Sequence, residues 1–223
     1  MWKKHLLRNA GALFKLREQL TEPFLLLNAD AVFDVDFRRM VNWHQNHKAL
    51  VTLFTHPNSH SYDSGLVVAE ADGSVSSWLT KEDARPQWYK NRVNAGLYVI
   101  DPTVLDMQLP LALNEIGNPQ RVGLDRQILK PLCGTHQMFA YDSPKYVKDM
   151  CTPGRYQQVC RDFKSGVVEN KNLQHSQKAI FLDRDGTINR YVGFLRTIDK
   201  FELCEGTAKG ICKTNESDYL AIE

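Results

Sequence analysis

An apolar run that ends abruptly in two acids constrains this chain more than any other feature. Residues 179–182 (AIFL) have the composition of a buried strand, and Asp183 and Asp185 follow at once, ahead of Gly186-Thr187. Placing carboxyl groups directly beside water-avoiding residues is costly unless the acids have a chemical role. Because ligands of open α/β sheets bind beyond the carboxyl ends of the strands, we expect both acids at the rim of such a sheet.

The two acids have the chemistry of a phosphoryl-transfer site. A carboxylate at this position can attack phosphorus and form an aspartyl-phosphate, which suits Asp183. Asp185, two residues on, can protonate the leaving oxygen. Both can help to hold Mg²⁺, which prefers carboxylate oxygens. The pattern therefore predicts catalytic and magnesium-binding roles for Asp183 and Asp185.

The rest of the chain also alternates strands and helices. Residues 24–27 and 49–54 are short apolar runs typical of strands covered on both faces, and residues 37–47 between them have helical spacing. Strand, helix and strand in this order predict a right-handed crossover and a parallel pair. Further strands are expected at 65–70, 75–79, 93–100, 137–141, 146–148 and 219–222, and helices at 11–20, 122–132, 153–163 and 206–214.

Composition excludes several classes of function. The chain of 223 residues has 28 basic and 26 acidic residues and a formal charge of +2, so no nucleic-acid or membrane-surface partner is expected. No run of about 18 apolar residues predicts a membrane span, and the N-terminal residues do not resemble a signal peptide. Five cysteines without zinc-site spacing predict free thiols and a cytoplasmic location.

Two more acids follow predicted strands far apart in the sequence. Asp30 comes after residues 24–27, and Asp149 comes after residues 146–148. Acids from distant strand ends can converge on one Mg²⁺ that also binds phosphates. From spacing alone, ordinary turn or capping roles for both residues remain the simpler interpretation.

Several segments favour the metal-binding interpretation over the turn or capping one. They are Gly11-Ala12-Leu13, LNAD at 27–30, YDSGLV at 62–67, VNAGLY at 93–98, and Asp149 followed by Thr152-Pro153. On these segments, residues 11–156 resemble the sugar-phosphate nucleotidyltransferases, which join a nucleoside triphosphate to a sugar 1-phosphate. The resemblance implies that Asp30 and Asp149 are Mg²⁺ ligands and that Asn94 and Gly65 contact the sugar. Glu82 is a weaker substrate-binding match, because the family usually places this glutamate before a lysine and here it follows one.

The DRDGTIN segment at 183–189 resembles the opening motif of haloacid-dehalogenase-like phosphatases. The closest branch includes histidinol-phosphatase and heptose-bisphosphate phosphatase enzymes. The resemblance implies that Asp183 is the nucleophile and Asp185 the general acid/base. The Asp183 side chain and the Asp185 carbonyl would bind Mg²⁺, and Thr187 would bind substrate.

The two resemblances predict an α/β chain with two parts. Residues 1–164 would form an incomplete nucleotidyltransferase domain, Rossmann-like with a mixed sheet, and residues 165–177 a linker. Residues 178–223 would form the first segment of a haloacid-dehalogenase-like Rossmannoid domain. We expect both parts to be truncated, because no glycine-rich phosphate loop precedes Gly11 and the sequence ends before the later phosphatase motifs.

Two hypotheses of different classes follow. The first is a Mg²⁺-dependent enzyme of heptose metabolism, or a piece of one, with sugar phosphate and a nucleoside triphosphate as partners. Its phosphatase would act on D-glycero-D-manno-heptose 1,7-bisphosphate, and its nucleotidyltransferase on the resulting 1-phosphate. The second is a non-catalytic fragment that binds sugar phosphate or a complementary chain. The sequence leaves the nucleotide and the oligomeric state open.

Overall fold

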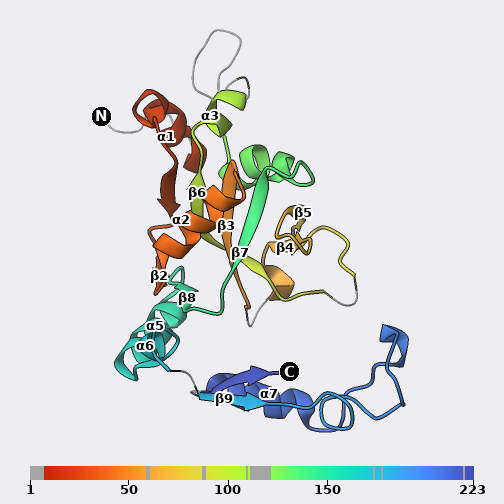
Figure 1. The fold of residues 1–223 in the computed structure, drawn as a ribbon. Coiled ribbons are helices and arrows are strands. Elements are labelled where there is room, and N and C mark those ends of the chain that lie inside the picture. Colours follow the sequence, from red (N-terminus) through yellow and green to blue (C-terminus); the bar gives the residue numbers. More distant parts are fainter. Residues whose placement is uncertain are drawn as a thin grey trace. The chain divides into compact units, whose positions relative to one another are not determined.

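The computed structural model divides the chain between Cys151 and Thr152 (Figure 1). The first unit comprises residues 1–151 and the second residues 152–223. Helix α5 (Pro153–Lys164) therefore groups with the second unit, whereas the sequence-based boundary kept it in the first. The structure describes residues 8–58, 61–86, 89–108, 110, 122–172, 174–176, 178–217 and 219–223.

A mixed sheet of six strands forms the centre of the first unit, within the described residues. The order is β5-β4-β6-β3-β7, and β1 pairs with β6. Strand β3 is parallel to β7 and antiparallel to β6, so the sheet combines both pairings. The strands are β1 (Phe24–Leu27), β3 (Val51–His56), β4 (Leu66–Ala69), β5 (Val75–Leu79), β6 (Val93–Ile100) and β7 (Met138–Asp142).

The predicted parallel pair of residues 24–27 and 49–54 is wrong in one respect. Strands β1 and β3 do run in the same direction, but β6 lies between them and is antiparallel to both. Ile100 in β6 is opposite Phe24 on one side and Val51 on the other. The long β6 strand pairs along both of its edges, and it therefore lies between β1 and β3.

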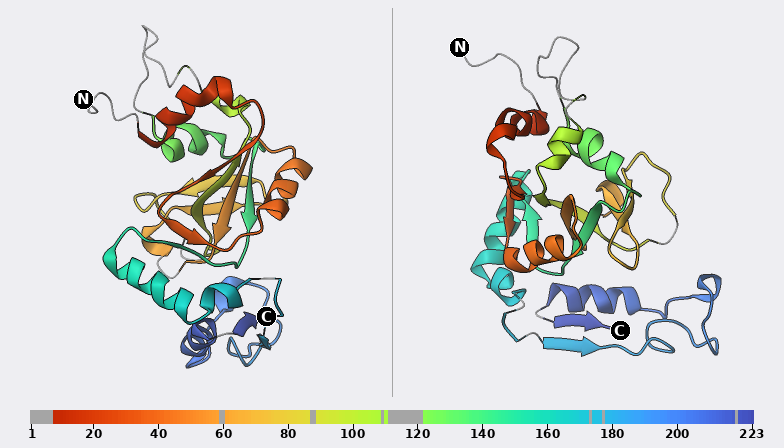
Figure 2. Two further views of the ribbon diagram at one scale, coloured as in Figure 1. Left: turned by 90° about the vertical axis from the view of Figure 1, so that its left-hand side faces the viewer. Right: turned by 45° about the horizontal axis from the view of Figure 1, so that its top comes forward.

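Helices cover both faces of this sheet (Figure 2). On one face, Met40 of α2 (Phe37–Asn46) packs with Leu97 and Val99 of β6. Helix α2 begins at Asp36, whose side chain accepts a hydrogen bond from the Arg39 amide at 3.1 Å and caps the helix. On the other face, Tyr98 and Ile100 of β6 belong to a larger cluster with residues of α1 (Arg8–Leu16) and of the π-helical turn η3 (Leu124–Leu129). Alternate side chains of β6 thus serve opposite faces, as the pleat of a strand requires.

Short elements complete the first unit. Strands β2 (Ala31–Phe33) and β8 (Val147–Asp149) form an antiparallel ribbon, of which the sequence predicted only the second strand. The predicted helix over 122–132 is replaced by η3 and by the 3₁₀ turn η4 (Lys130–Leu132). The remaining elements are η1 (Arg17–Gln19), η2 (Ser61–Asp63) and α3 (Thr103–Met107).

The second unit contains the strand–helix–strand arrangement that the sequence predicts. Strands β9 (Lys178–Phe181) and β10 (Tyr219–Ile222) are parallel, and α7 (Thr207–Glu216) lies in the sequence between them. Figure 2 shows α7 running alongside this two-stranded ribbon. Its other elements are α6 (Val167–Asn170), inside the expected linker, and η5 (Ile198–Lys200).

We expect fast amide exchange across β9 and β10. Among the described residues of 178–223, only Asn189 is buried, whereas Phe181 is 77% and Phe194 is 90% exposed. So few residues rarely bury enough apolar surface to be stable alone, and local opening follows low burial. Hydrogen exchange followed by NMR should show exchange many times faster in β9 and β10 than in β3 and β6. Uniformly slow exchange over 178–223 would contradict this.

The described residues contain no helix that is both long and apolar enough to cross a membrane. None of the five cysteines, all of which lie among the described residues, forms a disulfide.

Candidate active site

Asp30 and Asp149 lie at the same end of the β2–β8 ribbon. Ala31 is directly opposite Asp149, and Asp30 comes immediately before it. The Met150 amide donates to the Asp30 carbonyl oxygen at 2.7 Å, which closes this end of the ribbon. Strand pairing therefore brings together two acids that are far apart in the sequence.

The side chain and backbone of Cys151 connect the two carboxylates. Its thiol donates to Oδ2 of Asp30 at 3.1 Å, and its amide donates to Oδ1 of Asp149 at 3.2 Å. Hydrogen bonding to Asp30, and then to Asp149, raises the pKa of the Cys151 thiol to about 11. A raised thiol pKa is what a concentration of negative charge produces.

This pair of carboxylates fits the way proteins hold Mg²⁺. The ion is usually bound through one or two carboxylates together with waters and substrate phosphates. Within the described part of the chain, no group of three or more histidine, cysteine, aspartate or glutamate side chains could hold a metal. Asp30 and Asp149 could supply two carboxylates, and the remaining ligands would then come from water and substrate.

The turn that carries Asp30 is tied to β6. The Asn28 amide donates to the Gly96 carbonyl at 3.0 Å, and the Ala31 amide donates to the Asn28 carbonyl at 3.4 Å. Gly96 has a φ of +74°, and a Cβ atom there would overlap the Asn28 side chain. Glycine is required at position 96 for both reasons.

Gly65 and Asn94, the predicted sugar-contacting residues, are neighbours in the sheet. Leu66 of β4 is opposite Val93 of β6, and the Asn94 amide donates to the Gly65 carbonyl at 3.4 Å. A Cβ atom on Gly65 would lie 2.6 Å from Nε1 of Trp78, so the backbone approaches that indole closely.

Hydrogen bonds orient the Asn94 side chain. Nδ2 of Asn94 donates to the Tyr98 hydroxyl at 2.7 Å, and Oδ1 accepts from the Gly96 amide at 3.2 Å. The Tyr98 hydroxyl in turn donates to Oδ1 of Asp125 in η3 at 3.2 Å. Burial and the neighbouring Asp125 carboxylate raise the pKa of Tyr98, so it stays protonated.

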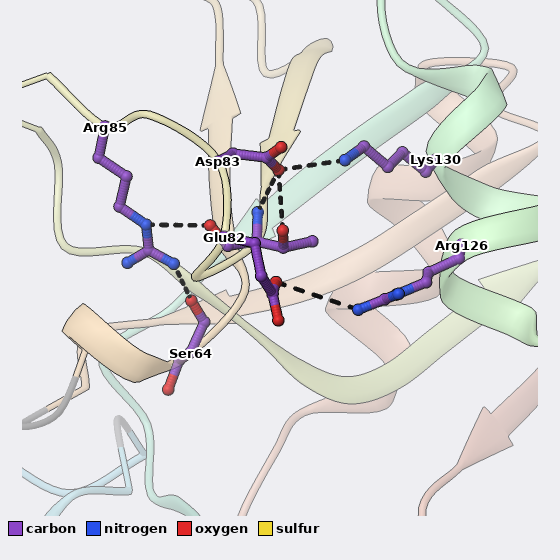
Figure 3. A network of polar contacts seen from close by, with 7 residues as sticks. Ser64, Glu82, Asp83, Arg85, Arg126 and Lys130 are labelled. Carbon is purple, nitrogen blue, oxygen red and sulfur yellow. Dashed lines mark hydrogen bonds and ion pairs between the residues drawn. The ribbon is translucent and has the colours of Figure 1, made fainter.

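Glu82 lies on the loop after β5, within the network of Figure 3. Its carboxylate is 4.0 Å from Nη2 of Arg126, and both side chains are exposed. The adjacent Asp83 accepts hydrogen bonds from the Thr80 amide at 2.7 Å and the Thr80 hydroxyl at 2.9 Å, and it pairs with Lys130 at 3.2 Å. The Thr80 amide, then the Thr80 hydroxyl and Lys130, hold the pKa of Asp83 at about 2.

Arg85 attaches this loop to the segment that precedes Gly65. Its guanidinium donates to the carbonyl of Ser61 at 2.6 Å, of Ser64 at 2.5 Å and of Thr80 at 3.3 Å. The contacts of this loop, of Asn94 and of η3 form separate groups that are joined through neighbouring residues of the chain, and we call them together the polar ring. The polar ring consists of Ser61, Ser64, Gly65, Thr80, Glu82, Asp83, Arg85, Asn94, Tyr98, Asp125, Arg126 and Lys130.

The structure therefore brings the three predicted substrate-binding residues of the first unit into one polar ring. Gly96 connects this ring to the acid pair, because it contacts both Asn94 and Asn28. Sequence reasoning missed Tyr98 and Asp125. The spacing of Asn94 and Tyr98 by four residues places them on one face of a strand and was the available signal.

In the second unit, Asp183 and Asp185 lie just beyond the end of β9, as predicted. The amide of Leu182 still pairs with the Ile222 carbonyl at 2.8 Å. Asp185 then accepts hydrogen bonds from Nε and Nη2 of Arg184, at 3.1 and 2.9 Å. The Arg184 guanidinium is the main cause of the lowered pKa of Asp185.

Two further residues of the motif have defined contacts. The carbonyl of Thr187 accepts a hydrogen bond from the Thr207 hydroxyl at 3.1 Å, which ties the motif to α7. Nδ2 of Asn189 donates to Asp185 at 3.3 Å and to the Arg190 carbonyl at 2.9 Å. Oδ1 of Asn189 is buried and has no donor among the described residues, although buried acceptors usually have one.

The family comparison identifies the first unit. The model of the nucleotidyl transferase family matches residues 7–149, more than half of the chain. The chain belongs to the nucleotidyl transferase family. The match ends before the second unit, so it does not test residues 178–223.

Curated relatives point to the same family. The mannose-1-phosphate guanylyltransferase catalytic subunit beta of Xenopus tropicalis is 30% identical over 171 residues, which are 74% of this chain and 42% of that protein. The catalytic subunit beta from Dictyostelium discoideum is 27% identical over 187 residues, covering 82% of this chain and 46% of that protein. The chain thus spans less than half the length of these relatives.

Solved structures share the α/β mixed-sheet fold. HddC from Yersinia pseudotuberculosis matches with a TM-score of 0.56 at 15% identity, over 72% of this chain and 64% of that one. A putative glucose-1-phosphate thymidylyltransferase from Bacillus anthracis matches with a TM-score of 0.54 at 14% identity, over 76% and 65% of the two chains.

Proposed function

We propose that the first unit belongs to a Mg²⁺-dependent enzyme that transfers a nucleotidyl group to a sugar 1-phosphate. The convergence of Asp30 and Asp149 on Cys151, beside the polar ring, carries this proposal. Two carboxylates at one ribbon end suit a cation that also binds phosphates. The side-chain amide of Asn94 suits a sugar hydroxyl, which both donates and accepts hydrogen bonds.

In this reaction a phosphate oxygen of the sugar 1-phosphate attacks the α-phosphorus of the nucleotide, and pyrophosphate leaves. When bound, Mg²⁺ would supply positive charge to the phosphate oxygens as negative charge develops on them. Asp30 and Asp149 would hold the ion, and Asn94 and Gly65 would orient the sugar. Positioning of both substrates is a main source of rate enhancement in phosphate chemistry.

The names of the relatives support a substrate class. Those proteins are named as guanylyltransferases of mannose 1-phosphate, so we propose GTP and a manno-configured sugar 1-phosphate. The D-glycero-D-manno-heptose 1-phosphate that the sequence suggests is manno-configured too, with one more carbon. The assay below distinguishes the hexose from the heptose.

The test is an assay of the purified chain with Mg²⁺, the common nucleoside triphosphates, and mannose or heptose 1-phosphate. We expect pyrophosphate release that requires both GTP and the sugar phosphate. Calorimetric titration with each substrate should accompany it. Binding of sugar phosphate without turnover would favour the non-catalytic alternative. The absence of both binding and turnover would overturn the proposal.

A second candidate function belongs to the second unit: removal of phosphate from a sugar bisphosphate. The observation that favours it is the location of Asp183 and Asp185 beyond the end of β9 in a parallel strand–helix–strand arrangement. A donor from water or a ligand would satisfy the buried oxygen of Asn189. Asp183 would attack phosphorus to form an aspartyl-phosphate while Asp185 protonates the leaving oxygen, and water would then hydrolyse the aspartyl-phosphate to release phosphate.

This candidate is tested by phosphate release from heptose 1,7-bisphosphate with Mg²⁺. Activity that disappears in Asp183→Asn, and persists in a matched Asp199→Asn control, would support the assignment. Equal activity in both variants, or none in the unmodified chain, would contradict it for this chain.

A further inference from the structure

Asn94 has an amide whose two ends are distinguished by its neighbours. The Tyr98 hydroxyl has a single hydrogen, and it donates that hydrogen to the Asp125 carboxylate at 3.2 Å. The same hydroxyl must therefore accept from the Asn94 atom that lies 2.7 Å away, which requires Nδ2. The Gly96 amide independently requires Oδ1 at the other end of the side chain, 3.2 Å away.

These three contacts use only part of the hydrogen-bonding capacity of the Asn94 amide. Within the described part of the chain, these contacts leave one N–H of Nδ2 and one lone pair of Oδ1 unused. If the Asn94 amide could rotate by half a turn, its free N–H and its free lone pair could exchange places. With Tyr98 and Gly96 in place, the order is set before a ligand arrives, which lowers the cost of binding.

Asp125 and Tyr98 are well placed for this role. Tyr98 is only 2% exposed, and its ring belongs to the larger core cluster, so its hydroxyl has little freedom to move. Asp125 is exposed to solvent as a residue, but partial burial of its carboxylate raises its pKa. The adjacent Arg126 pairs with Glu82, so η3 also contacts the loop after β5.

We propose that Asp125 and Tyr98 are positioning residues that fix the orientation of the Asn94 amide and thereby set the affinity for the sugar 1-phosphate. This inference rests on the proposed function of the first unit. It adds two residues that would not touch the sugar and would act only through Asn94. The direction of donation runs from Asn94 to Tyr98 and from Tyr98 to Asp125.

The first experiment needs no ligand. The Asn94 side-chain amide resonances are assigned in ¹⁵N-labelled protein by comparison with Asn94→Asp. In Tyr98→Phe we expect both amide protons to move toward the values of a solvent-exposed asparagine. In Tyr141→Phe, which removes a tyrosine hydroxyl elsewhere in the same sheet, they should stay in place. Unchanged Asn94 resonances in a folded Tyr98→Phe protein would overturn the inference.

The second experiment measures binding and turnover with mannose 1-phosphate and GTP. Loss of one oriented hydrogen bond should raise KM for the sugar phosphate about tenfold in Tyr98→Phe and Asp125→Leu, with KM for GTP unchanged. Asp125→Asn keeps an acceptor oxygen for Tyr98 and should restore KM to within about twofold of the unmodified chain.

A double-mutant cycle separates positioning from a merely structural effect. If Tyr98 acts through Asn94, then Tyr98→Phe should cause no further loss in an Asn94→Ala background. Additive losses would contradict the inference while leaving nucleotidyl transfer intact. An unmodified chain that neither binds nor turns over these substrates would instead count against the proposed function, and the NMR result would still decide the orientation of Asn94.

Discussion

Asp149→Asn is expected to lower kcat/KM for sugar-nucleotide formation by at least about 100-fold, the upper end of the effect seen when only the support of a metal ligand is removed. The neutral amide would remove one of the two carboxylates that converge on Cys151. Mg²⁺ binds charged oxygens much better than amide oxygens, and the remaining Asp30 would hold it alone. Steady-state kinetics at several Mg²⁺ concentrations would measure the loss, which excess Mg²⁺ should partly reverse.

Asp106→Asn is the matched control for this variant. It makes the same chemical change in the first unit, at an exposed carboxylate that pairs with Arg17 at 2.9 Å. An exposed pair contributes little, so activity should stay within about twofold of the unmodified chain. Comparable losses in the two variants would show that Asp149 has no special role.

Gly96→Ala is expected to destabilise the first unit by roughly 2–5 kcal/mol. A side chain at a left-handed φ costs about 1–2 kcal/mol, and overpacking typically costs about 1–3 kcal/mol more. Both apply, because Gly96 has a φ of +74° and the added Cβ would overlap the Asn28 side chain. Urea unfolding followed by tryptophan fluorescence would measure the change.

Gly134→Ala separates the two contributions. Gly134 also has a φ of +74°, but the nearest atom to an added Cβ is the Ser76 carbonyl oxygen at 3.8 Å. This variant should therefore show only the backbone cost of about 1–2 kcal/mol. If both variants lose the same stability, the close approach of Asn28 to Gly96 contributes nothing.

Much of the fold could be predicted from the sequence because local patterns decide individual elements. Apolar runs predicted β1, β3 and β6 to within about two residues, the usual uncertainty of an element boundary. The sequence predicted Asp30 and Asp149 after strands, but their approach to each other depends on the pairing of β2 with β8, which was not predicted. Their role followed only from the resemblance, because spacing alone could not distinguish metal ligands from turn residues.

Strand order could not be predicted in the same way. The hydrophobic patterns of β1 and β3 are the same whether they pair with each other or with the two edges of β6. The short β2 strand was missed because only its pairing with β8 makes it a strand. Contacts such as that between Tyr98 and Asp125 join distant parts of the chain and leave no local signal.

Paramagnetic NMR with Mn²⁺ in place of Mg²⁺ tests the central claim most directly. Mn²⁺ broadens the amide resonances of nearby residues and shares the preference of Mg²⁺ for oxygen ligands. Substoichiometric Mn²⁺ should selectively broaden the amides of Ala31, Met150 and Cys151, which surround the acid pair. The broadening should disappear in the Asp30→Asn/Asp149→Asn double variant. Unbroadened resonances in the unmodified chain, or the same broadening in the double variant, would contradict a metal site at Asp30 and Asp149.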